Sequence, residues 1–161
     1  MVKKAFALLA VLSIVLCLCS CGQDTDKDIS MYDLQKAMLE ADGELPEMLT
    51  FSSSEDGAED AFSYISDLDY SKVKSFFLAY ASDGMAYEIA VIQLKNSADA
   101  GEAAETLEAH RQDRINLYKT YEPDQVPKAE SAVVKAVDNF AVLIMCGNQT
   151  GVEKAFTDFI K

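Results

Sequence analysis

The sequence predicts an α+β domain with a four-stranded, mostly antiparallel sheet built from two strand-strand-helix units. Two pairs of short segments are rich in aromatic and β-branched residues, and a turn sequence joins the members of each pair. A segment with helical spacing of apolar residues follows each pair. We expect both of these helices to pack on one face of the sheet, and a helical segment to precede it at the N-terminus.

Residues 1–20 are predicted to be a lipoprotein signal peptide. Lys3 and Lys4 precede the apolar run 5–19, which is shorter than the ~20 residues that usually span a bilayer. The run leads into Leu18-Cys19-Ser20-Cys21, which places an aliphatic residue three positions before a cysteine and a small one directly before it. An ordinary cleaved signal or an uncleaved anchor helix is the alternative.

Cys21 is the expected site of lipid attachment, with signal cleavage between Ser20 and Cys21. Cys17 and Cys19 are poor acceptors because Leu16 and Leu18 precede them. A lipid on Cys21 would hold the protein on the outer, extracytoplasmic face of the cell membrane.

Residues 21–29 are predicted to be the lipidated N-terminus and a tether, and residues 30–161 a single domain. The polar, charged run 22–28 lacks hydrophobic periodicity. Its spacing Asp24-x-Asp26-x-Asp28 begins like a calcium loop, but Ile29 and Gln35 occupy the glycine and glutamate positions of that template. We therefore expect no metal site there.

The cysteine count and the net charge limit the function further. Processing leaves Cys146 as the one free thiol, so no intramolecular disulfide can form in the mature chain. The net charge of −13 becomes −15 when Lys3 and Lys4 are removed. This charge argues against nucleic acid and other polyanions as partners.

Helices are expected at the start of the domain. Ser30 and Asp33 form a variant of a capping box, apolar residues follow at helical spacing, and Gly43 can end the helix. Leu45-Pro46 then favours extended chain. Residues 58–65 are predicted to form a short helix.

The two strand-strand-helix units follow. Strands 73–81 and 86–95 flank an Asp-Gly turn, and a long helix starting at Asn96 or Ser97 should end before Pro123. Residues 123–130 are expected to be a loop. The second unit has strands 132–137 and 140–146, the turn Asp138-Asn139, and a last helix for which Thr150 and Glu153 form a capping box.

Several short segments resemble one family of small bacterial lipoproteins. Besides the cysteine motif and the tether, these are Tyr32-Asp33-Leu34, Glu88-Ile89-Ala90-Val91, Tyr118-x-x-Tyr121-x-Pro123-x-Gln125, Ala132-Val133-Val134 and Asn139-Phe140-Ala141-Val142-Leu143. Over roughly residues 30–160 the chain is similar to the domain-of-unknown-function 4358 family, found mainly in Gram-positive bacteria. The resemblance implies a cell-surface location and transfers no catalytic or binding residue.

Several residues of types that can act in catalysis or bind a ligand have a structural explanation instead. We expect His110 to be an exposed helix residue, Cys146 a small core residue, and Tyr118 and Tyr121 to close the core beside Pro123. The carboxylates of an acidic stretch are expected in solvated loops, and a cation site is the alternative: Asp56, Glu59, Asp60, Asp67 and Asp69. Asn148-Gln149-Thr150 is better explained as helix capping than as a glycosylation sequon.

The function expected from these observations is a membrane-anchored binding or assembly module without enzymatic activity and without a cofactor. No catalytic motif is recognisable in the sequence. The alternative is a surface hydrolase that assembles carboxylates from distant positions. Because the strands are apolar on both faces, something must cover the second face of the sheet. We expect the N-terminal segment to cover it, and a protein partner or self-association is the alternative.

Overall fold

The antiparallel sheet has five strands, one more than the sequence predicted. A computed structural model describes residues 29–161, so the signal peptide, Ser20, Cys21 and the tether up to residue 28 lie outside the described residues. The strands are β1 Met48–Ser52, β2 Val73–Ala81, β3 Glu88–Leu94, β4 Val133–Val137 and β5 Phe140–Met145. The helices are α2 Met31–Glu40, α3 Ala58–Ser63, α4 Ala100–Tyr121, α5 Val126–Ser131 and α6 Gln149–Ile160, with single 3₁₀ turns at Tyr70–Lys72, Ser97–Asp99 and Pro123–Gln125.

The strands lie in the order β1-β2-β3-β5-β4, and each neighbouring pair is antiparallel. The second hairpin joins the first through β5, so Val91 of β3 lies opposite Val142 of β5. The additional strand β1 pairs with β2 from the outer edge, where Phe51 lies opposite Leu78. It was missed because it forms no hairpin signal: α3 and a loop separate it from its partner in the sequence.

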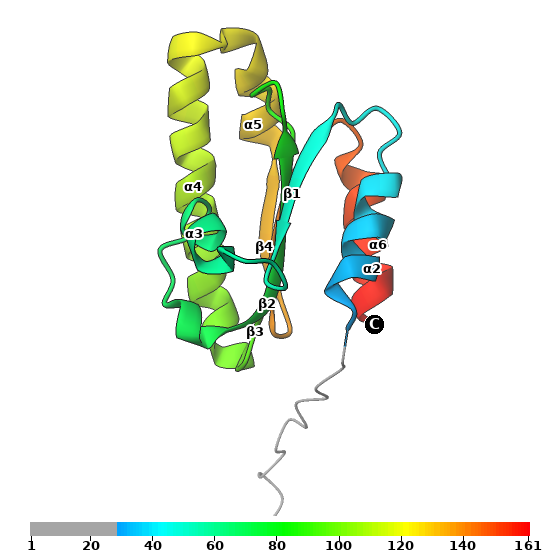
Figure 1. Cartoon of the computed structure of the whole chain (residues 1–161). Coiled ribbons are helices and arrows are strands. Elements are labelled where there is room, and N and C mark those ends of the chain that lie inside the picture. The colour runs from blue at the N-terminus through cyan, green and yellow to red at the C-terminus, as the bar shows by residue number, and fades with distance from the viewer. Residues whose placement is uncertain (1–28) are drawn as a thin grey trace, which may run out of the picture.

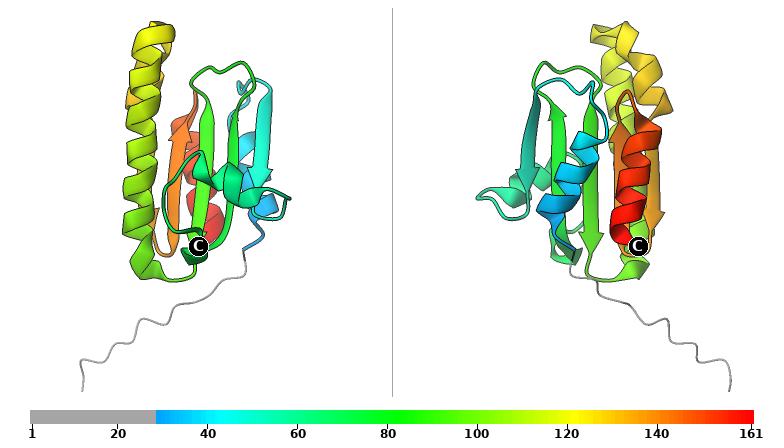
Figure 2. Two further views of the ribbon diagram at one scale, coloured as in Figure 1. Left: turned by 60° about the vertical axis from the view of Figure 1, so that its left-hand side comes forward. Right: turned by 90° about the vertical axis from the view of Figure 1, so that its right-hand side faces the viewer.

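The prediction that both C-terminal helices lie on one face of the sheet was wrong. Figure 1 shows α3, α4 and α5 on one side of the sheet and α2 with α6 on the other, and Figure 2 shows the same division from two further directions. The physical reason lies in the strands, which are apolar on both faces. Adjacent residues such as Val91 and Ile92 are both fully buried and point to opposite faces, so each face needs its own cover.

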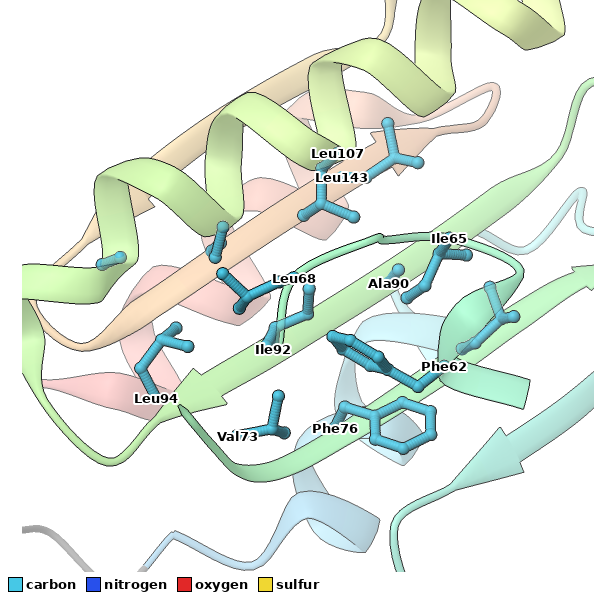
Figure 3. Close-up of a cluster of buried hydrophobic side chains, with 14 residues drawn as sticks. Phe62, Ile65, Leu68, Val73, Phe76, Ala90, Ile92, Leu94, Leu107 and Leu143 are labelled. Carbon is cyan, nitrogen blue, oxygen red and sulfur yellow. The ribbon is translucent and has the colours of Figure 1, made fainter. Parts of the chain in front are cut away.

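The core under α4 holds most of the large aromatic contacts. Phe62 of α3 meets the edge of Phe76 of β2 with ring centroids 5.3 Å apart, and Leu107 of α4 packs in the same cluster above Leu143 of β5. Figure 3 shows these side chains converging from α3, α4 and the sheet. This layer fixes the position of α4 relative to the segment after α3.

The core on the opposite face is shared by the first and last helices. Leu34 and Met38 of α2 are fully buried with Val152 and Phe156 of α6. The N-terminal segment therefore does cover the second face, as predicted, but it shares that role with α6. Phe51 of β1, which also belongs to the segment before the first hairpin, packs on the α4 side.

Helix boundaries follow local signals, with two corrections. Ser30 caps α2 by accepting the backbone N–H of Asp33, as predicted. The cap of α6 is Asn148, whose side chain accepts from the backbone N–H of Gly151, rather than Thr150. The predicted loop 123–130 is helical, because prolines pre-set the helical φ in the first turns of the 3₁₀ segment and of α5.

Candidate functional site

A buried carboxylate lies at the start of β3 and faces α4. Glu88 is 1% exposed. Its Oε1 lies 2.6 Å from Nε2 of His110, and its Oε2 lies 3.5 Å from Nε of Arg114. The His110 and Arg114 side chains are also largely buried, at 10% and 14% exposure. Two residues one helical turn apart thus meet the same carboxylate.

This arrangement orients the imidazole ring. An ionised carboxylate can only accept hydrogen bonds, so Nε2–H of His110 donates to Glu88. The guanidinium of Arg114 supplies the positive charge that a buried carboxylate needs.

Tyr118 ties this group to the hairpin between β2 and β3. Arg114 donates to the Tyr118 hydroxyl, which in turn donates to the backbone carbonyl of Gly84 at 3.2 Å. Burial raises the pKa of Tyr118 above its usual value of 10.0. The hydroxyl therefore stays protonated and can keep both bonds at neutral pH.

A pocket of about 220 Å³ lies beside His110, between α4 and the segment that follows α3. Its wall is formed by Ser63, Tyr64, Ile65, Ser66, Asp67, Thr106, Ala109, His110 and Asp113. Tyr64 is 46% exposed, and its ring meets the His110 ring at a steep angle, with centroids 5.4 Å apart. An aromatic ring from the segment after α3 thus meets an imidazole from α4 in the pocket wall.

The pocket wall is held in place by hydrogen bonds between its two sides. The hydroxyls of Ser66 and Thr106 lie 2.7 Å apart, and the backbone N–H of Leu68 donates to Ser66. Thr106 also donates to the carbonyl of Ala103 within α4. These bonds fasten the segment after α3 to the helix, so the pocket is preformed.

The charge of the pocket wall is negative. Asp67 and Asp113 are exposed on its rim, and no lysine or arginine is among the residues that form the wall. In the part of the chain that the structure describes, neither of these two carboxylates forms an ion pair. The same part contains no group of three or more His, Cys, Asp or Glu residues that could hold a metal ion.

Sequence reasoning placed some of these residues wrongly. His110 is not an exposed helix residue, because its ring is bonded to Glu88. Glu88 itself was missed, although a glutamate at the start of an otherwise apolar strand is a signal that it needs a partner. Tyr118 is buried as predicted, whereas Tyr121 is 72% exposed.

Two other predictions agree with the structure. Cys146 is a buried core residue, and burial raises the pKa of its thiol to about 12. The carboxylates of the acidic stretch are exposed as expected, although Glu59 and Asp60 lie in α3 and not in a loop. Of these, Asp67 also belongs to the pocket. No helix within residues 29–161 combines the length and the apolar character needed to cross a membrane.

A family model described as "Domain of unknown function (DUF4358)" matches residues 47–146. The chain belongs to this family. The DUF4358 match runs from β1 to the end of β5 and contains Glu88, His110 and the whole pocket wall, while α2 and α6 lie outside it. No curated protein and no solved structure matches the chain.

Proposed function

We propose that this protein is a small-ligand-binding module that the lipid on Cys21 anchors to the outer face of the cell membrane. The observation that supports binding is the preformed pocket beside α4. One of its walls is an imidazole whose orientation the buried pair of Glu88 and Arg114 fixes. Fixing a polar group before the ligand arrives reduces the entropy lost on binding.

The pocket suits recognition better than carboxylate catalysis. Its two rim carboxylates, Asp67 and Asp113, are exposed to solvent. A catalytic carboxylic acid is usually held protonated by burial in an apolar site. The pocket is also smaller than the roughly 300–1,000 Å³ of drug-sized ligand sites, so the ligand should be small.

The binding function can be tested with the one histidine of the chain. Because no other histidine contributes, the ring signals of isotope-labelled His110 in the full chain report on the pocket without assignment. We expect compounds from a library of small polar fragments to shift these signals saturably. If no fragment of any class does so, the pocket is not a binding site.

The anchoring is tested separately, by cell fractionation and mass spectrometry. Cys21→Ala should abolish acylation and either release the protein from the membrane or leave the signal uncleaved. Cys19→Ala and Cys146→Ala are matched controls, which should both stay processed and membrane-bound. A Cys21→Ala protein that is still cleaved after Ser20 and membrane-bound would contradict the assignment of Cys21.

A hydrolase is the second candidate, and the pair of Glu88 and His110 favours it. A carboxylate that fixes an imidazole beside a pocket is also the arrangement of a general base. The full chain and its His110→Gln variant would be compared for hydrolysis of activated esters. Turnover that disappears in the variant would support the hydrolase and count against a purely binding role.

A further inference from the structure

We propose that the pocket between α4 and the segment after α3 binds a small organic ammonium ion. This inference rests on the proposed binding function and specifies its ligand. The juxtaposition that carries it is two rim carboxylates, a half-exposed aromatic ring and an oriented imidazole around one preformed volume of about 220 Å³.

The carboxylates determine the charge of the ligand. Asp67 and Asp113 come from opposite sides of the pocket, one from the segment after α3 and one from α4. The wall offers no lysine or arginine to neutralise them, and Arg114, one turn further along α4 than His110, is paired with Glu88. The net charge of −13 for the whole chain acts in the same direction. The pocket therefore favours a cation over an anion.

The imidazole forms a fixed polar part of the pocket wall. His110 is nine-tenths buried, and its Nε2 lies 2.6 Å from Oε1 of Glu88, so the ring is held in one orientation beside the pocket. An ammonium N–H is a hydrogen-bond donor, and the carboxylates of Asp67 and Asp113 are acceptors that the pocket wall offers to it. A quaternary ammonium has no N–H group to donate to these carboxylates.

The aromatic ring favours an organic cation over a metal ion. Tyr64 is 46% exposed at the pocket, and its ring contacts both His110 and Tyr80, with centroids 5.4 Å and 5.5 Å away. The face of an aromatic ring attracts ammonium groups and packs against their alkyl chains. Together with two carboxylates, it provides one apolar and two charged contacts, which match a short alkylammonium ion.

The test is a titration of the full-length protein with n-propylammonium chloride. Binding is monitored through the NMR signals of the ring of the single histidine. Sodium chloride at equal ionic strength controls for salt, and n-propanol is the neutral analogue of similar shape. We expect a saturable shift with the ammonium ion and none with the two controls. Equal shifts with n-propanol, or no saturable shift with the ammonium ion, would overturn the proposal.

Variants of the two rim carboxylates distinguish binding in the pocket from a general effect of the net charge of the protein. Asp113→Asn and Asp67→Asn should each weaken n-propylammonium binding about three- to fivefold, because each removes one solvent-exposed charged partner. Glu105→Gln is the matched control: it removes the same charge from an exposed position of α4 outside the pocket, and binding should stay within about twofold. Equal weakening in all three variants would show that only net charge matters and would contradict the site.

The failure of this proposal can be told apart from failure of the binding function. If fragments of another class shift the His110 signals while n-propylammonium does not, the pocket binds a different ligand and only the ammonium proposal falls. If no fragment of any class shifts them, both fall. Thermal unfolding of each variant shows whether the fold is intact. Because both rim positions are exposed, we expect them to tolerate replacement of Asp by Asn.

Discussion

The Asp42 carboxylate accepts the backbone N–H of Asn148 at 2.8 Å, and this contact joins the end of α2 to the start of α6. The other oxygen of Asp42 accepts the backbone N–H of Glu44, and the amide of Asn148 donates to the carbonyl of Ala41. A negative charge at the first turn of α6 also interacts favourably with the helix dipole. This connection holds together the two helices that cover one face of the sheet.

Replacement of Asp42 by Asn should destabilise the protein at neutral pH. Burial raises the pKa of Asp42, but the backbone N–H groups of Asn148 and Glu44 outweigh it, and the net pKa lies below the usual 3.8. The ionised carboxylate therefore contributes stability above pH ~4, and this contribution is lost as the pH falls through the lowered pKa. We expect Asp42→Asn to cost about 1–3 kcal/mol at pH 7 in urea unfolding.

At pH 3 the difference in unfolding free energy between the native chain and Asp42→Asn should be smaller than at pH 7. Glu44→Gln, at an exposed neighbouring position, is the control and should change the stability by less than about 0.5 kcal/mol. A pH-independent difference for Asp42→Asn would show that the charge of Asp42 does not contribute.

The thiol of Cys146 should be unreactive in the folded protein. Its pKa is raised to about 12, first by burial and then by the neighbouring charge of Asp42. Only the thiolate reacts with alkylating reagents. We expect labelling of Cys146 by iodoacetamide at pH 8 to require urea, and the melting temperature to be unaffected by dithiothreitol. Rapid labelling without denaturant would contradict the buried position of this thiol.

Introduction of a charge at Val142 should unfold the domain. Val142 is fully buried in β5, between β3 and β4, and faces the core under α2 and α6. An unpaired buried carboxylate costs several kcal/mol, which is comparable to the total stability of about 5–15 kcal/mol of a typical domain. Circular dichroism should show loss of cooperative unfolding in Val142→Asp, whereas Ala136→Asp on the exposed side of edge strand β4 should fold.

Release of α2 from the sheet should cause self-association. Leu34 and Met38 are the fully buried residues of this helix. The double variant Leu34→Asp, Met38→Asp would uncover part of an apolar sheet face, and such patches are rare on monomers. Size-exclusion chromatography should show oligomers or aggregates for the double variant. Tyr32→Asp, at a position of α2 that is 73% exposed, should elute as the unmodified protein does.

Local patterns were enough to predict most elements. The predicted strand 73–81 has the bounds of β2, and the Asp138-Asn139 turn joins β4 to β5, with Asp138 at a φ of 51°. Asn96 accepts from the backbone N–H of Ala98 just before α4, which ends before Pro123. These features depend on residues close in sequence, through capping, turn conformation and alternation of side chains.

The sequence by itself therefore determined the α+β class, the two hairpins, the capped helices and the need to cover two apolar sheet faces. Tertiary structure alone decided that α6 crosses to the face opposite α4 and that β1 extends the sheet beside β2. It also decided that Glu88 contacts His110, which lies 22 residues later in the sequence. The reason is that periodicity shows which side of an element is apolar, whereas the choice of partner depends on contacts between residues far apart in the chain.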